Sequence, residues 1–282
     1  MATSKETTFE KFLIKEYLRF GSINKVFQKH HYCLPISLSG FDRLLNKYHV
    51  IKSAGPNSKF SESLYLISLL ANYKIPLEKL YHQHAPHSLQ VSTNTLHRIL
   101  HFTRLGLTRR QGAILIITPP NDPQSILVGS DQSLGSSSIM GKRGDLTLPM
   151  GHTKVGEPIR DSLARILQSE VFSKSIVSQK FPWGIIPEHI LPFVNINLTD
   201  IKVSVYHLEL PQKYPQFSSY KLKNLKLTNI NDFDFKKFRP GIKEAIEIYL
   251  QKDRYLDQVI PTINSDLNTM IFALARDQAR MK

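Results

Sequence analysis

The chain of 282 residues is long enough for two domains, and its 41% hydrophobic and 21% charged residues are ordinary for a soluble globular protein. It has no run of about 18 uncharged apolar residues and its N-terminus is polar, so we expect neither a membrane span nor a secretory signal. The single cysteine, Cys33, excludes an internal disulfide and a multi-cysteine zinc site, which is typical of a cytoplasmic protein.

The net charge of +14 is concentrated toward the N-terminus. Residues 1–105 contain 14 Lys and Arg against 6 Asp and Glu, together with eight of the 11 His. A basic segment of this kind favours a nucleic acid as partner. The alternative is a basic surface without such a partner, which many globular proteins have.

Three short helices are predicted within the first 52 residues. Periodic apolar residues indicate helices over 8–19 and 23–28, and a third helix after a cap at Ser39. This spacing is typical of a helix-turn-helix unit whose third helix reads DNA. Arg and Asn suit base edges, whereas Lys and Ser suit phosphates. The side chains expected to contact DNA are Ser39, Arg43, Asn46, Lys47 and Lys52.

Residues 61–105 repeat this pattern after a linker rich in Gly, Pro and Ser. Apolar residues at a nearly constant offset indicate a tandem unit, so the repeats would span 8–52 and 61–105. The third helix of the second repeat would present Asn94, His97 and Arg98 to DNA. The alternative for both units is a bundle for packing or protein docking, in which the basic side chains are merely solvated.

The periodicity changes to that of strands after residue 106. Apolar runs over 113–118 and 125–129, with a Pro-rich turn between them, predict a hairpin. Residues 130–142 are rich in Ser and Gly and predict a loop. A third strand then leads through glycines at 151 and 156 into a helix that starts at Glu157 and Pro158. A strand, a glycine loop and a helix commonly present N–H groups to an anion.

The segment 147–173 resembles the signature of the Nudix family. That signature runs Gly, five residues, Glu, seven residues, Arg, Glu, an aliphatic residue, any residue, Glu, Glu, any residue, Gly and an aliphatic residue. The positions that match in register are Gly151, Glu157, Arg165, Leu167 and Glu170. The positions that depart are Ile166 and Ser169, in place of two glutamates, and Phe172 and Ser173, in place of the closing pair.

In the Nudix family, the three glutamates of this helix hold a divalent metal and assist the attack of water on a diphosphate linkage. One of the three remains here, so the resemblance implies the fold more strongly than the reaction. If the chain hydrolyses a diphosphate, Mg²⁺ or Mn²⁺ would be held by Glu157 and Glu170. Compensating carboxylates could come from Asp131, Asp145 or Glu209. Arg165 would pair with an acid, its usual role in the family.

The remaining elements follow the order that the family resemblance implies, which covers about residues 107–252. Residues 201–210 predict a strand whose apolar phase switches, through either a bulge or burial on both faces. A weaker strand is predicted over 220–227, and a helix over 239–250. Trp183 is interpreted as a core residue, with a base pocket as the alternative. A helix over 263–281 would form a homodimer contact or pack on its own domain.

We therefore expect an α+β protein: an all-α helix-turn-helix domain, single or tandem, in 1–105, an α/β/α Nudix-type sandwich in 106–254 and a C-terminal helix in 255–282. The leading hypothesis is a DNA-binding transcription regulator whose Nudix-like domain senses a nucleotide-type ligand without catalysis. The alternatives are an active hydrolase of nucleoside diphosphate derivatives and a structural protein-interaction module. The expected partners are double-stranded DNA and the nucleotide-like ligand, without a membrane.

Overall fold

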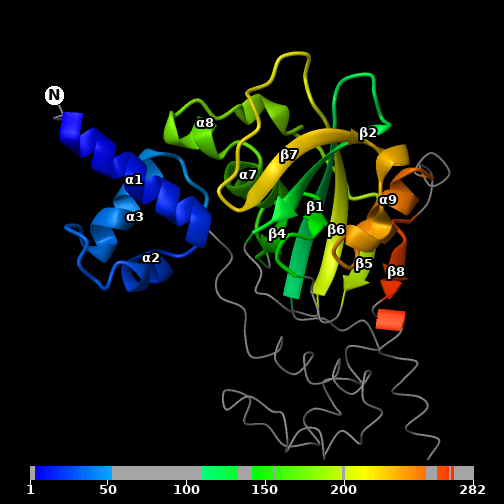
Figure 1. The fold of residues 1–282 in the computed structure, drawn as a ribbon, viewed down its shortest axis with the longest axis horizontal. Coiled ribbons are helices and arrows are strands. Elements are labelled where there is room, and N and C mark those ends of the chain that lie inside the picture. Colours follow the sequence, from blue (N-terminus) through cyan, green and yellow to red (C-terminus); the bar gives the residue numbers. More distant parts are fainter. Residues whose placement is uncertain are drawn as a thin grey trace, which may run out of the picture.

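The computed structural model describes residues 4–52, 110–132, 142–154, 156–198, 201–251, 259–266 and 268–269. Within these ranges the chain combines helices with two β-sheets, which confirms the α+β class (Figure 1). The second helical unit predicted at 61–105, with Asn94, His97 and Arg98, lies outside the described residues. The same holds for most of the loop predicted at 130–142 and most of the helix predicted at 263–281.

Three helices form at the N-terminus where the periodicity predicts them. They are α1 (Ser4–Phe20), α2 (Ile23–Lys29) and α3 (Leu38–Lys47). The predicted cap of the third helix is wrong by two residues, because the Ser37 hydroxyl, and not that of Ser39, accepts the Gly40 N–H at 3.0 Å. Ser39 lies within the first turn instead. We call residues 4–52 the helical unit.

Two sheets make up the rest of the described chain. The larger has the strand order β4-β1-β6-β5-β8, and the smaller has the order β3-β2-β7. The strands are β1 (Arg110–Thr118), β2 (Ser125–Asp131), β3 (Leu146–Thr147), β4 (Met150–Thr153), β5 (Val194–Leu198), β6 (Ile201–Glu209), β7 (Leu222–Asn229) and β8 (Thr262–Asn264). The helices are α7 (Ile159–Glu170), α8 (Ser173–Val177) and α9 (Ile242–Tyr249), with 3-10 turns at Trp183–Ile185, Ile230–Asp232 and Phe235–Lys237.

The predicted hairpin of β1 and β2 is wrong, because the two strands belong to different sheets. β1 lies between β4, which is antiparallel to it, and β6, which is parallel. The reason is burial on both faces: Ala113 and Leu115 enter one hydrophobic cluster, while Ile114 and Ile116 enter another. β6 behaves in the same way, so its phase switch comes from burial on both faces, one of the two predicted explanations.

The C-terminal part departs from the predicted helix at its start. Ile263 and Asn264 belong to β8, which pairs in parallel with β5 at the edge of the larger sheet.

Trp183 also departs from its core interpretation, since it is 40% exposed and its ring packs edge-on against Phe181 with centroids 4.9 Å apart. Among the described helices, none has the length and apolar character needed to cross a membrane.

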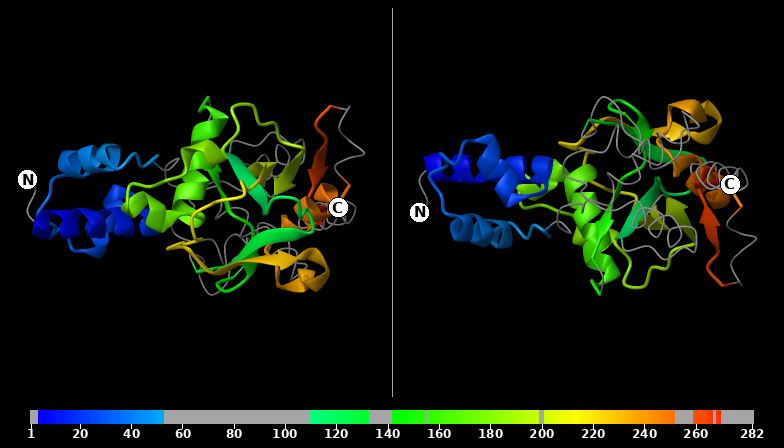
Figure 2. Two further views of the ribbon diagram at one scale, coloured as in Figure 1. Left: turned by 90° about the horizontal axis from the view of Figure 1, so that it is seen from above. Right: turned by 90° about the horizontal axis from the view of Figure 1, so that it is seen from below.

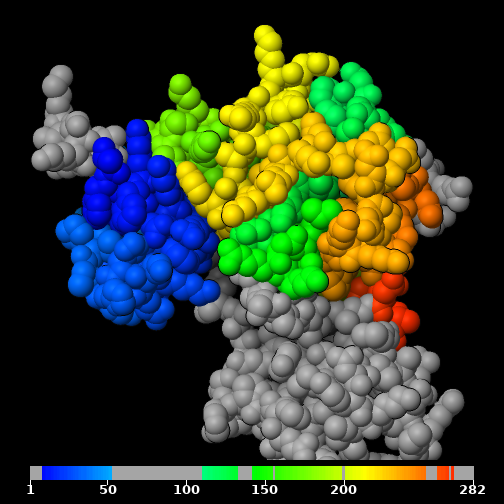
Figure 3. Space-filling model, viewed as in Figure 1, coloured from blue at the N-terminus to red at the C-terminus, as the bar shows by residue number. Residues whose placement is uncertain are grey.

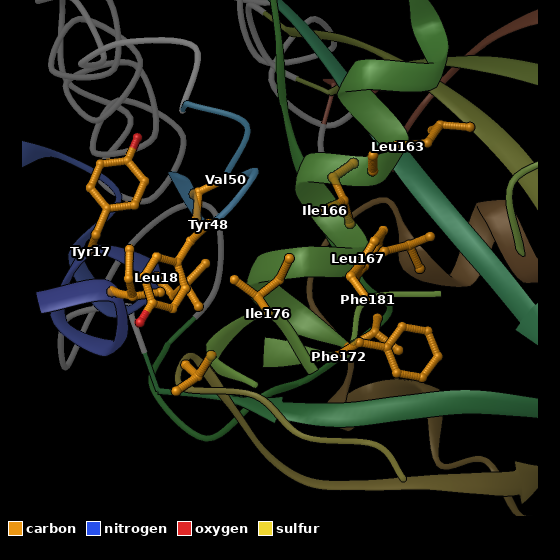
Figure 4. Packing of buried hydrophobic residues seen from close by; sticks show 14 of the residues in the cluster. Tyr17, Leu18, Tyr48, Val50, Leu163, Ile166, Leu167, Phe172, Ile176 and Phe181 are labelled. Atoms are coloured by element: carbon orange, nitrogen blue, oxygen red, sulfur yellow. The ribbon is translucent and has the colours of Figure 1, made fainter. Parts of the chain in front are cut away.

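The helical unit shares one hydrophobic cluster with the sheet domain. Figure 4 shows Leu18, Tyr48 and Val50 of the helical unit on the side that faces Ile176 of α8. Figure 2 shows the helical unit at one end of the described chain, beside α7 and α8, and Figure 3 shows its surface in the view of Figure 1. As a result α7, which the sequence predicts to be amphipathic, is buried continuously from Ser162 to Gln168.

The shared cluster predicts that truncating Leu18 destabilises the whole protein. Leu18 is 3% exposed, so Leu18→Ala should lower the free energy of unfolding by about 2–5 kcal/mol, through lost burial and the cavity left behind. Urea unfolding followed by circular dichroism would measure this. Leu38→Ala is the control, because Leu38 is 52% exposed and should change stability by about 0.5 kcal/mol or less. Equal effects of the two variants would contradict the shared core.

Candidate functional site

The guanidinium group of Arg165, on α7, is the centre of the signature segment. It donates to both carboxylate oxygens of Glu157, with Nη2 to Oε2 at 2.6 Å, and to the carbonyl oxygen of His152 at 3.0 Å. Its Nη1 also donates to the carbonyl oxygen of Lys52, in the helical unit, at 3.2 Å. The predicted pairing of Arg165 with an acid is thus present, and both side chains are only 9% exposed.

Glu157 is held as a carboxylate by several donors. The Ser162 hydroxyl donates to Oε2 at 2.5 Å, and the Lys154 N–H donates to the same oxygen at 3.1 Å. Burial alone would raise the pKa of Glu157, but the hydrogen bonds from Arg165 and Ser162 outweigh it and lower the pKa to about 2. The loop before α7 is therefore closed by a charged bridge.

Ile166 is an apolar residue at the position where the Nudix signature has its first helix glutamate. Its side chain is 2% exposed and belongs to the cluster shared with the helical unit. A Cβ added to Gly151 would lie only 3.0 Å from Ile166 Cγ1, so the matching glycine of β4 leaves room for this isoleucine. Gly151 and Ile166 are thus brought together as a packing pair.

Glu170, the glutamate of α7, is buried and has protein partners. The Met150 N–H donates to its Oε2 at 2.8 Å, and the Lys221 ammonium lies 4.0 Å from its Oε1. Burial raises the pKa of Glu170, while Lys221 acts in the opposite direction. A second buried ion pair, Asp131 with Arg239 at 2.6 Å, also affects the pKa of Glu170: the Asp131 carboxylate raises it and the Arg239 guanidinium lowers it.

These residues do not fit the divalent metal that the Nudix resemblance implies. Hard dications prefer several oxygen ligands, and in the described part of the chain no three His, Cys, Asp or Glu side chains come together. Glu157 is taken by Arg165, and Glu170 faces an ammonium group. Ser169 directs its hydroxyl to the carbonyl oxygen of Ile166 at 3.3 Å. The interpretation of Glu157 and Glu170 as metal ligands therefore lacks support from the geometry.

The carboxylates that could have compensated are also engaged. Asp131 forms its ion pair with Arg239. Asp145 accepts the Lys142 N–H at 2.8 Å, and Glu209 accepts the Asn121 N–H at 3.4 Å.

Gln168 is a contact residue that the sequence reasoning missed. Its Oε1 accepts the Ile51 N–H and its Nε2 donates to the His49 carbonyl oxygen, both at 2.9 Å. Together with the bond from Arg165 to Lys52, this joins α7 directly to the backbone that leaves α3. A single polar residue in an amphipathic helix gives no signal of this kind, because solvent exposure is its usual explanation.

The predicted DNA-contacting residues of the helical unit differ in whether their side chains form ion pairs. Arg43 and Asn46 are exposed on α3. Lys47 pairs with Glu10 at 2.7 Å, and Lys52 pairs with Asp42 at 2.6 Å. Both lysines keep about half their side-chain surface in solvent, at 54% and 41%, so these exposed pairs are weak and can be exchanged for phosphate.

No family model matches the chain, and no curated protein matches it either. Solved structures that resemble it in fold include Nudix proteins. A Nudix hydrolase from Nitrosomonas europaea is 13% identical, with 55% of this chain and 78% of that chain covered and a TM-score of 0.40. An ADP-ribose pyrophosphatase from Streptococcus suis is 12% identical, with 55% and 99% covered and a TM-score of 0.38. The Nudix domain of Shewanella oneidensis NrtR, solved with ADP ribose, is 15% identical, with 52% and 87% covered and a TM-score of 0.33.

Placing a glutamate at position 166 should damage the protein. Ile166→Glu would bury a carboxylate in the shared cluster, at a cost of about 3 kcal/mol or more in the free energy of unfolding. Ser169→Glu, at the other departing position, is only half-buried and should cost about 1 kcal/mol or less. Denaturant unfolding of both variants measures the difference, and an Ile166→Glu protein as stable as the wild type would refute the packing role.

The bridge between Glu157 and Arg165 predicts a stability loss at low pH. Because folding lowers the pKa of Glu157 from 4.5 to about 2, its stabilisation is complete above about pH 4.5 and disappears as the pH falls toward 2. Glu157→Gln should cost on the order of 3 kcal/mol at pH 7, since it leaves Arg165 uncompensated, and should flatten this pH dependence. Urea unfolding between pH 7 and pH 2 tests it, with the exposed Glu188→Gln as control.

Proposed function

We propose that this protein is a DNA-binding regulator whose Nudix-like domain binds a nucleotide-type ligand and does not hydrolyse it. The observation that carries the proposal is the environment of α7. One side of the helix has apolar Ile166 where hydrolysis would need a carboxylate, and its other side holds the helical unit through Arg165 and Gln168. A helix that joins no cluster of metal ligands among the described residues, and that bonds directly to a neighbouring unit, is suited to transmit binding.

The helical unit supports the DNA-binding part of the proposal. Its third helix exposes Arg43 and Asn46, which suit bidentate contacts to base edges. Its first helix exposes Lys11, Lys15 and Arg19 at four-residue intervals, which places three cations along one side of the helix for phosphate contacts. We interpret α2 and α3 as the helix-turn-helix, with Ser39, Lys47 and Lys52 as additional phosphate contacts.

The nucleotide-type ligand is proposed from the residual signature, and ADP ribose is the first compound to test. A ligand alters DNA affinity only by binding the DNA-competent and DNA-incompetent conformations with different strength. The bonds from Arg165 to Lys52 and from Gln168 to His49 and Ile51 provide a route for such a difference, because they tie α7 to the segment that follows α3.

The DNA-binding proposal predicts that Arg43→Ala weakens specific binding by about 1–3 kcal/mol, or roughly five- to 150-fold. Selection of bound sequences from a random pool would first identify a site, and gel shifts at several salt concentrations would then compare the variants. Arg160→Ala is the control, because Arg160 is an exposed arginine on α7, outside the helical unit. The logarithm of the affinity should fall linearly with the logarithm of the salt concentration.

The other outcomes identify the competing functions. If no sequence is enriched from the pool, the regulator proposal fails. Release of phosphate or nucleoside monophosphate from nucleoside diphosphate derivatives with Mg²⁺ or Mn²⁺ would favour the hydrolase. Failure of both DNA and ligand to bind would leave the structural protein-interaction module.

A further inference from the structure

A polar pocket lies on the α7-facing side of the larger sheet, beside the loop that precedes α7. Its volume is about 200 Å³, and β1, β4, β5 and β6 contribute to its walls. The side chains that matter for its chemistry are Lys154, Lys202, Asn195, Ser204, Tyr206 and Ser162. The pocket is separate from the buried group of Glu170, Asp131, Lys221 and Arg239, none of which lines it.

The charge of the pocket is positive. Lys154 and Lys202 both line it, and neither ammonium has an ion-pair partner among the residues that the structure describes. Glu157 also lines the pocket, but its charge is neutralised by Arg165. Two cations that lack an ion-pair partner among the described residues, in a concave site with polar walls, favour an anion.

Hydrogen-bond donors complete the recognition chemistry. Ser204 donates its hydroxyl to Asn195 Oδ1 at 2.7 Å, which orients the Asn195 amide so that its nitrogen remains available to donate. The buried ring of Tyr206 forms an adjoining wall. Phosphate, with several acceptor oxygens around one centre, matches two ammonium groups and an amide better than a single carboxylate does.

The geometry points to a phosphate-binding effector site: we propose that this pocket receives the phosphate group of a small metabolite. The volume of about 200 Å³ lies below the range of roughly 300–1,000 Å³ that is usual for drug-sized ligands. It therefore suits inorganic phosphate, a compact phosphate ester or one phosphate end of a larger molecule. The binding part stands on the pocket alone, while the effector role rests on the proposed regulatory function.

The effector role follows from two side chains that the pocket shares with the α7 network. Glu157 and Ser162 line the pocket, and both contact the Arg165 guanidinium. Arg165 in turn donates to the Lys52 carbonyl oxygen at the end of the helical unit. An anion in the pocket would add negative charge beside Glu157 and so compete with it for the Arg165 guanidinium. The bond from Arg165 to the Lys52 carbonyl oxygen would change as a result.

The binding test uses the full chain and three probes: inorganic phosphate, glucose 6-phosphate and ADP ribose, each compared with chloride at the same ionic strength. At least one probe should raise the melting temperature, and the Lys154→Ala/Lys202→Ala double variant should bind it at least tenfold more weakly by calorimetry. Lys213→Ala, which removes an exposed lysine outside the pocket, should bind as the wild type does. The three probes distinguish free phosphate from an ester and from a nucleotide.

Lys202→Gln provides a second variant that removes the charge but retains a polar side chain, and it should by itself weaken binding severalfold. If the double variant unfolds, this single variant decides. Equal affinity of the wild type and the lysine variants, or no binding of any probe to the wild type, would overturn the phosphate site.

A second measurement separates the site from the regulation. The DNA affinity of the wild type is determined with and without the probe that binds, and a change that disappears in Lys202→Gln supports the effector role. Binding that requires the lysines but leaves DNA affinity unchanged would retain the phosphate site and refute its effector role. Absence of any DNA binding would refute the proposed function, while the phosphate site would still stand on the calorimetry.

Discussion

The bridge between Arg165 and Glu157 is the interaction on which the other features of the site depend. One guanidinium group holds the loop before α7 through Glu157, the end of β4 through the His152 carbonyl and the helical unit through the Lys52 carbonyl. A planar fork with five donors is the side chain best suited to serve three partners at once. Because every contact comes from a different part of the chain, this residue joins the loop, the sheet and the helical unit.

The two sides of α7 make different contacts in this structure. Two residues that match the signature shape this region. Gly151 leaves room for the Ile166 side chain, and Arg165 closes the loop before α7 by its bond to Glu157. Two positions that hold glutamates in the Nudix signature are apolar Ile166 and uncharged Ser169 here. Glu170 faces the ammonium of Lys221, so its charge is met by the protein itself. The pocket near the first turn of α7, lined by Lys154 and Lys202, could bind an anion without a metal ion.

Much of the architecture could be predicted from local patterns, whereas the pairing of distant segments could not. Periodicity located α1–α3, α7 and β6, because burial of one face or two leaves a repeat in the sequence. The partners of β1 were mistaken, since an apolar run such as Ala113–Thr118 fits a hairpin and a central strand equally well. The site divides in the same way: the family resemblance implies that Arg165 pairs with an acid, but that acid is Glu157, which was predicted as a metal ligand. Gln168 and Lys221 act through backbone or side chains more than 40 residues away, for which a single sequence carries no sign.

The shared hydrophobic cluster has a consequence for the order in which the chain acquires its structure. During synthesis the helical unit is completed long before α7 and α8 exist, and Gln168 is separated from Ile51 by 117 positions. Until that later segment has been made, Leu18, Val50 and Tyr48 lack the surface that covers them in the finished protein. The helical unit therefore exposes apolar surface until α7 and α8 have been synthesised. During this interval the nascent chain is prone to aggregation. An early basic segment that repels its own copies would oppose this association.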